Sequence, residues 1–166
     1  MAFRFGAEIN PKFVKYNLID HGFLLNLLGI GDSTNSIVKE LLVDNAADLV
    51  DKGSLTEMVA GLELLKYMSP NERHDLYYWQ NLTRGTVSEV DYVLSRGIDI
   101  VPMEVKSGLR GSMASLYVFM EKEHIKYAIR CSLENFGEFV SPKGKKILVN
   151  PLYAISNLFS CGERLL

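Results

Sequence analysis

The clearest helical pattern of apolar residues lies between residues 54 and 70. In the stretch SLTEMVAGLELLKYMSP, apolar side chains recur at the spacing that places them on one face of a helix. These residues are Leu55, Met58, Val59, Leu62, Leu65 and Met68. Pro70 closes the segment, because proline lacks the backbone N–H that a helix interior needs. The pattern predicts a helix with one face packed on a core.

After this helix the apolar period changes to two. Runs rich in β-branched and aromatic residues predict strands at 76–80, 87–94 and 100–106, with turns at NLTRGT and SRGID between them. Pro102 cannot donate a backbone hydrogen bond, so we expect it at the start of the third strand or at an unpaired position. Two short turns make these three strands an antiparallel meander.

Helical spacing returns at residues 112–122 and is followed by the strand pattern HIKYAIRCSL. The segment KKILVNPLYAIS then predicts another strand, or a short helix beyond Pro151. From residue 54 the predicted order is therefore helix, three strands, helix, strand. This order indicates an α/β fold with a mixed sheet flanked by helices, in which a helical crossover reaches the later strand.

The first 53 residues look like an extension of this core. Residues 12–20, KFVKYNLID, alternate like a strand, and residues 21–31 have the pattern of a short apolar helix that ends at glycines. A second helix is predicted at 36–50, after the capping signal DSTN. We expect an N-terminal strand and helix extension, residues 1–53, packed on a core of residues 54–166 as one compact domain.

Composition supports a globular protein with a real core. The chain has 166 residues, of which 48% are hydrophobic and 23% are charged. No apolar run is long enough to span a bilayer, and the N-terminal stretch MAFRFGAEIN lacks the apolar segment of a secretory signal. We therefore expect a cytoplasmic protein without membrane association. Its two cysteines lack CxxC spacing, which favours buried or incidental thiols over a metal or redox role.

The net charge of −2 conceals an uneven distribution. Residues 1–105 carry 9 Lys and Arg against 15 Asp and Glu, whereas residues 106–166 carry 9 against 5. The basic excess comprises Lys106, Arg110, Lys122, Lys126, Arg130, Lys143, Lys145 and Lys146. It is either a surface that faces phosphates or an ordinary solvated face, and charge alone favours the solvated face.

Charged residues interrupt the apolar hairpin EVDYVLSRGIDIVPMEVKSG. Strand alternation puts Glu89 and Asp91 on one face, and pairing of the two strands would bring Asp91 beside Glu104 and Lys106. Mg²⁺ favours such carboxylates, and the backbone carbonyl of Val105 could add a further oxygen ligand. The alternative is a wet strand face on which the acids and the lysine are solvated.

The spacing also resembles a known signature. Asp91 followed after twelve residues by Glu104, Val105 and Lys106 resembles the D…ExK motif of the PD-(D/E)XK nuclease superfamily, whose restriction-endonuclease-like core has the order αβββαβ. More narrowly, the chain resembles a domain of unknown function found at the C-terminus of many prokaryotic AAA-family ATPases. The matching stretches are KYNLIDHGFLLNLLGI, SLTEMVAGLELLKY, LYYWQ, EVDYVL, IVPMEVKSG and LVNPLYAI.

The resemblance implies roles for four residues. Asp91 and Glu104 would be metal ligands, Lys106 a catalytic lysine, and Glu57 a further acid from the first core helix. For Glu57 a second interpretation stays open, because Ser54 to Glu57 also reads as an S-x-x-E capping box. Glu89 matches no catalytic position, and we interpret it as solvated or as a neighbour of the ligands.

The implied function is hydrolysis of DNA phosphodiester bonds with Mg²⁺ or Mn²⁺, in association with an AAA-family ATPase module in cis or in trans. The alternative is a catalytically inactive module that binds nucleic acid or regulates an ATPase through protein contacts. Two departures matter. Val90 precedes Asp91 where the superfamily has proline, and the chain contains no GxxxxGK[ST], so ATP hydrolysis is not implied.

Other residues attract a functional interpretation less strongly. The three histidines, His21, His74 and His124, show no ligand spacing, and we expect structural or surface roles for them. The aromatic run Tyr77, Tyr78 and Trp79 is either a platform for bases or core packing, and its position in a strand favours packing.

Overall fold

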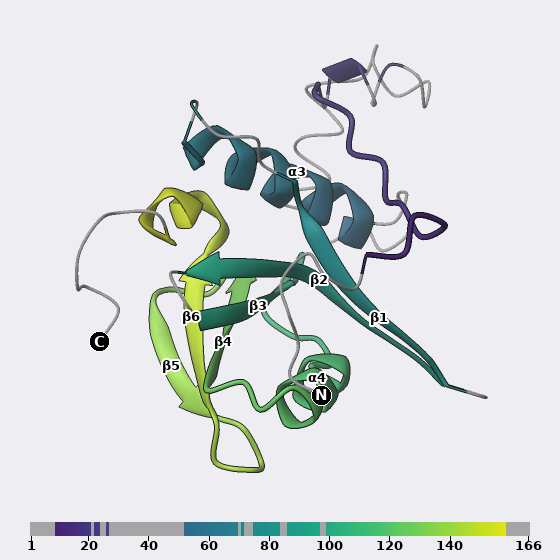
Figure 1. Cartoon of the computed structure of the whole chain (residues 1–166). Helices are drawn as coiled ribbons and strands as arrows, with labels where there is room; N and C mark the ends of the chain where they lie inside the picture. The colour runs from purple at the N-terminus through teal and green to yellow at the C-terminus, as the bar shows by residue number, and fades with distance from the viewer. Residues whose placement is uncertain are drawn as a thin grey trace.

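The fold was analysed in a computed structural model (Figure 1), which describes residues 9–20, 22–23, 26, 52–69, 71, 75–83, 86–96 and 99–158. The described elements, in chain order, are α3 (Lys52–Tyr67), β1 (Tyr77–Thr83), β2 (Thr86–Arg96), β3 (Asp99–Val105), α4 (Ala114–Lys122), β4 (Tyr127–Ser132), β5 (Gly137–Val140), β6 (Lys146–Pro151) and the 3-10 helix η2 (Leu152–Leu158). The predicted order from residue 54 is confirmed by the first six of these elements.

The strands form one mixed sheet of six strands in the order β1-β2-β3-β4-β6-β5. The meander of β1, β2 and β3 is antiparallel, as the two short turns predict. β4 pairs parallel to β3 because α4 carries the chain back across the sheet, and β6 pairs parallel to β4. The mixed α/β class is thus confirmed, although β5, which pairs antiparallel to β6, was not predicted.

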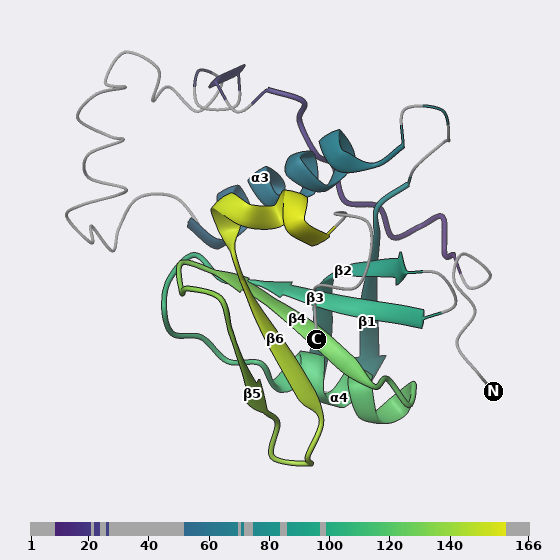
Figure 2. The same cartoon turned by 90° about the vertical axis from the view of Figure 1, so that its left-hand side faces the viewer.

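Helices cover both faces of the sheet (Figure 2). On one face α3 and η2 pack on a cluster that we call the α3-side core, formed by Ala60, Leu64, Tyr92, Val101, Met103, Val105, Ile129, Cys131, Ile155 and Leu158. On the other face α4 packs on the α4-side core, formed by Trp79, Val90, Val93, Met113, Leu116, Phe119, Met120, Ile125, Ala128 and Ile147. The buried apolar side chains of both clusters supply the main driving force for folding.

A β-bulge interrupts β2 in the middle of the sheet. β2 pairs with β1 at Val90 and again at Val93, but only one residue of β1 lies between the two partners. Asp91 and Tyr92 therefore share one position of the ladder. Val90 and Val93 both join the α4-side core, whereas Tyr92 joins the α3-side core. Strict alternation, which predicts Val90 with Tyr92 and Asp91 with Val93, is wrong here because the bulge adds a residue.

Several predicted boundaries also change. β1 continues through the stretch NLT, which was predicted as a turn, and the closing segment forms both a strand, β6, and a helical turn, η2. Pro102 lies opposite Val93 and immediately before the parallel ladder with β4, which begins at Met103.

Among the described residues, no helix combines the length and the apolar character needed to cross a membrane.

The N-terminal extension is described only in part. Residues 9–20 contain no strand, so the strand predicted at 12–20 is wrong. Most of its described apolar side chains are exposed, among them Phe13 at 44% and Tyr16 at 89%. The helices predicted at 21–31 and 36–50 fall almost entirely outside the described residues. The boundary at residue 53 stays a prediction.

Candidate functional site

The candidate site begins where β2 and β3 separate. The pairing between these strands runs from Arg96↔Asp99 to Tyr92↔Met103 and ends there. Asp91 and Glu104 are the next residues on the two strands. Here Asp91 Oδ2 accepts a hydrogen bond of 2.7 Å from the backbone N–H of Val105. A carboxylate therefore satisfies a strand donor at the point where the backbone ladder ends.

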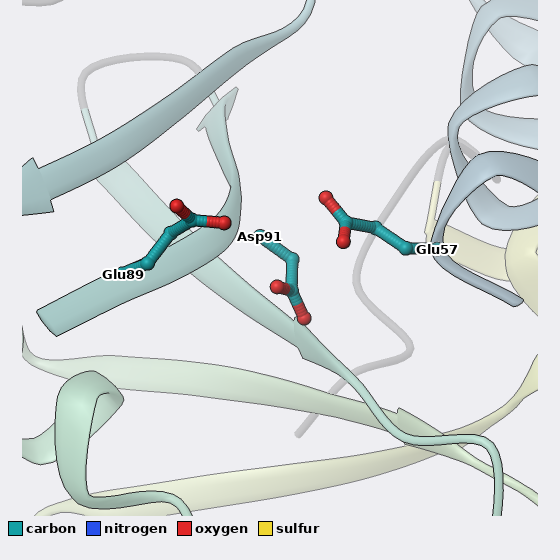
Figure 3. Close-up of side chains that lie close together, drawn as sticks. All are labelled: Glu57, Glu89 and Asp91. Carbon is teal, nitrogen blue, oxygen red and sulfur yellow. The ribbon is translucent and has the colours of Figure 1, made fainter. Parts of the chain in front are cut away.

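Three carboxylates meet beside this fork (Figure 3). Glu57 comes from α3, and Glu89 and Asp91 come from β2. Each offers one oxygen, and these oxygens all lie within 4.8 Å of one another. We call these three residues the acidic cluster. All three are partly buried, so water screens their mutual repulsion less than it would on an open surface.

Glu104 and Lys106 form the second part of the site. Glu104 is only 5% exposed, and its Oε1 accepts a hydrogen bond of 2.6 Å from Lys106 Nζ. Its other oxygen, Oε2, is buried without a hydrogen-bond partner among the described residues. A buried carboxylate oxygen left in this state is costly. The bare backbone of Gly111 accommodates Lys106, because a Cβ there would lie 2.7 Å from Lys106 Cδ.

A second lysine reaches the acidic cluster from the N-terminal segment. Lys15 Nζ lies 2.6 Å from Glu57 Oε1 and also pairs with Glu89 Oε1. The same ammonium lies 4.9 Å from the centre of the Tyr78 ring, within the range of a cation–π contact. The cluster is therefore bridged by a positive charge from a segment far away in the sequence.

Burial and mutual repulsion perturb the acids. Burial, with the nearby charge of Glu104, raises the pKa of Asp91 from 3.8 to about 6. Burial likewise raises the pKa of Glu57 and of Glu104, although hydrogen bonds from Lys15 and Lys106 act in the opposite direction. For Lys15, burial alone would lower the pKa, but the hydrogen bonds to Glu57 and Glu89 raise it. The site is short of positive charge.

The structure thus places the sequence candidates in two adjoining groups. Asp91 lies in the acidic cluster with Glu57, whereas Glu104 and Lys106 form the neighbouring pair; Glu104 is not a member of the three-carboxylate set. The electrostatic effect of Glu104 on Asp91 links the two groups. The roles of these residues as ligands and catalyst, and that of the Val105 carbonyl, stay predictions.

Two acids need a revised interpretation. α3 begins at Lys52, which places Ser54 inside the first turn and not at the N-cap that the capping box requires. The Glu57 carboxylate is hydrogen-bonded to Lys15. Glu89 joins the acidic cluster, although it matches no catalytic position of the motif. Its spacing of two residues from Asp91 on β2 was the available signal.

Most of the basic excess is paired with acids or carbonyls. Arg130 is buried and bonded to Glu134 at 2.6 Å, and Lys145 Nζ donates to the Met120 carbonyl at 2.6 Å. Further ion pairs are Lys126–Asp99, Lys143–Glu121 and Lys146–Glu138. This pairing favours the solvated-face interpretation over one continuous surface for phosphates.

The remaining candidates fit structural roles. Trp79 is buried, and its ring centre lies 5.0 Å from that of Phe119, which supports core packing. His124 is exposed in the turn after α4, where its φ is 56°. His21 and His74 fall outside the described residues.

The comparisons with known proteins identify a family but no characterised relative. The family model named Domain of unknown function (DUF4143) matches residues 52–155, which include α3 and every described strand. Neither the curated proteins nor the solved structures yielded a match.

Proposed function

We propose that this chain, which belongs to the DUF4143 family, is a metal-dependent nuclease-like domain that hydrolyses DNA phosphodiester bonds and works with an AAA-family ATPase module. The observation that carries the proposal is the buried Oε2 of Glu104, which has no hydrogen-bond partner in the described part of the chain, near an Asp91 whose pKa is raised to about 6. Such perturbed carboxyl groups gather at functional sites more often than elsewhere. The order α3, β1, β2, β3, α4, β4 supports a restriction-endonuclease-like core.

The residues present fit a hard divalent cation. Mg²⁺ and Mn²⁺ take oxygen ligands, and β2 and β3 both offer carboxylates here, with one oxygen that lacks a partner among the residues that the structure describes. Asp91, Glu104 and the Val105 carbonyl would hold the ion, with Glu57 as an additional acid. A cation bound there would polarise a phosphodiester and make hydroxide available near neutral pH.

Lys106 supplies the positive charge that phosphate chemistry needs. Its side chain is 22% exposed and its ammonium is held by Glu104 at 2.6 Å, so that it stays where β2 and β3 separate. From this position it can donate hydrogen bonds to a phosphate oxygen or to an attacking water, and so stabilise developing negative charge. Asp91, in turn, is fixed by its bond to the Val105 backbone.

The test is cleavage of plasmid and single-stranded DNA by the full chain with Mg²⁺, Mn²⁺ or EDTA. Glu104→Gln and Lys106→Met should each lower the metal-dependent rate on the order of a hundredfold or more, because each removes a charged group from the site. Asp99→Asn is the matched control, since Asp99 pairs with Lys126 on the surface of β3, away from the fork. Cleavage that survives in both site variants would be a contaminant's activity and would refute the assignment.

Metal binding without cleavage would favour the alternative, an inactive module that regulates an ATPase or binds nucleic acid. It is detected as a Mn²⁺-dependent rise in melting temperature that Glu104→Gln abolishes. A wild-type protein that shows neither cleavage nor a metal-dependent shift would refute the metal site.

A further inference from the structure

Lys15 contacts two carboxylates that adjoin the proposed metal ligand Asp91. Its ammonium bonds to Glu57 Oε1 and pairs with Glu89 Oε1, two of the three members of the acidic cluster. Among the described residues, Lys15 is the cationic side chain that forms ion pairs with this cluster. Lys106 is instead bonded to Glu104. The side chain of Lys15 is 32% exposed, so its ammonium can leave the acidic cluster and enter solvent.

The segment that carries Lys15 is otherwise lightly attached. Residues 9–20 contain no helix or strand, and the neighbours of Lys15, Val14 and Tyr16, are 59% and 89% exposed. A second contact comes from Asn17, which lies against Gly61 of α3 and the hydroxyl of Tyr92. Little apolar area would be lost if the segment moved away, so the Lys15 ion pairs are a main attachment among the described residues.

One ammonium does not balance the local negative charge. The acidic cluster contains three carboxylates, and Glu104 adds a fourth whose buried Oε2 has no partner within the described ranges. The pKa values of Glu57 and Asp91 stay raised even with Lys15 in place. A divalent cation would bring twice the charge and could take up the unpartnered oxygen, which the lysine does not reach.

We propose that residues 9–20 act as a tethered competitor of the metal, with the Lys15 ammonium and a divalent cation occupying the acidic cluster in turn. The inference rests on the metal site of the proposed function, which shares Asp91 and Glu57 with the acidic cluster. Tethering gives Lys15 a high effective concentration at the cluster, so a single ammonium competes well despite its weak individual affinity. Metal binding then releases the segment, and the segment in place lowers the apparent affinity for metal.

The size of the effect follows from the fraction of protein in which the cluster is free. If the segment occupies the cluster about 90% of the time, the apparent dissociation constant for metal is about tenfold higher than without the lysine. Lys15→Met removes the ammonium and keeps most of the aliphatic chain. Lys12→Met, in the same segment with an exposed side chain, changes the net charge equally and serves as the control.

The experiment combines Mn²⁺ titration calorimetry with hydrogen exchange of the amides of residues 9–20 in the full chain. We expect Lys15→Met to bind Mn²⁺ about tenfold more tightly than wild type, and Lys12→Met to bind like wild type. Saturating Mn²⁺ should speed exchange of residues 13–17 in wild type, and Glu89→Gln should do so without metal.

The outcomes separate the two proposals. Equal Mn²⁺ affinity in wild type and Lys15→Met would overturn the competition while leaving the metal site intact. Absence of Mn²⁺ binding in both proteins would overturn the metal site itself and the competition with it. Unchanged exchange of residues 13–17 on Mn²⁺ saturation would show that the segment and the metal bind together, which also overturns the inference.

Discussion

Asp91→Asn should stabilise the metal-free protein at neutral pH, although it removes a hydrogen-bonded carboxylate. Asp91 is partly buried next to Glu104 and in a cluster with Glu57 and Glu89, and this environment raises its pKa to about 6. The ionised form is therefore favoured less in the folded protein than in the unfolded chain. Asparagine has nearly the same shape but carries no charge, so the unfavourable interactions are removed.

The magnitude follows from the change in pKa. A carboxyl whose pKa rises from 3.8 to about 6 on folding costs about 3 kcal/mol of stability once it is fully ionised. Below about pH 4 this cost is absent, because the carboxyl then carries its proton in the folded and in the unfolded protein. The cost develops as the pH rises through about 6 and the folded protein loses this proton. Asparagine still accepts from the Val105 N–H, and the preference of that hydrogen bond for the ionised carboxylate is already contained in the pKa of about 6. The expected gain at pH 7.5 is therefore about 3 kcal/mol.

Urea unfolding at pH 4.5 and at pH 7.5, in EDTA, measures this effect directly. The difference in unfolding free energy between variant and wild type should move toward stabilisation as the pH rises. In thermal unfolding at pH 7.5 the variant should melt roughly 6–12 °C above wild type. Asp99→Asn, which breaks a surface pair with Lys126, should change stability by less than about 1 kcal/mol at both pH values. Equal destabilisation by Asp91→Asn at both pH values would refute the reasoning, since Asp91 would then serve only as an acceptor for the backbone.

Two further substitutions test how the site is supported. Gly61→Ala should lower the free energy of unfolding in urea by about 1–3 kcal/mol although alanine favours helices, because a Cβ would overlap the hydroxyl of the buried Tyr92. In the double variant, Tyr92→Phe should recover part of this loss, and additive losses would contradict the contact. Arg130→Met should lower the free energy of unfolding by about 1–3 kcal/mol, because it leaves Glu134 and the backbone carbonyl of Leu109 without their buried partner. The control Lys126→Met, at an exposed ion pair, should cost about 0.5 kcal/mol or less. Equal losses would refute a buried network at Arg130.

The fold could be predicted where a single period runs through a whole element. The helical spacing predicts α3 but not its exact core face, since Ala60 and Leu64 lie in the α3-side core while the predicted Leu65 is 38% exposed. The period of two in β3 matches the burial of Val101, Met103 and Val105 in the same core. β5 could not be found in this way, because all four of its residues are exposed and its pairing with β6 carries no burial pattern. The strand predicted at 12–20 is wrong for the opposite reason: the apolar alternation is present, but most of these apolar side chains are exposed.

The candidate site divides along a similar line. Asp91, Glu104 and Lys106 could be found from sequence because their spacing along two adjacent strands resembles a known motif. Lys15 could not be found, because its contact with Glu57 spans 42 residues and depends on a segment without regular structure. Glu89 lies in the same hairpin sequence, but it matches no position of the D…ExK motif. Spacing reveals contacts within a hairpin, but not contacts made by a segment that docks from elsewhere.

The bulge in β2 connects the fold to the site. Because Asp91 and Tyr92 share one ladder position, both side chains can turn toward α3, which a regular strand would not allow. Tyr92 donates a hydrogen bond of 2.7 Å to the backbone carbonyl of Glu57, and Gly61 leaves room for its hydroxyl. That bond joins β2 to the turn of α3 that carries the Glu57 carboxylate of the acidic cluster. Removing the bulge residue would turn Asp91 or Tyr92 away, and either change would separate acids that the fold otherwise holds together.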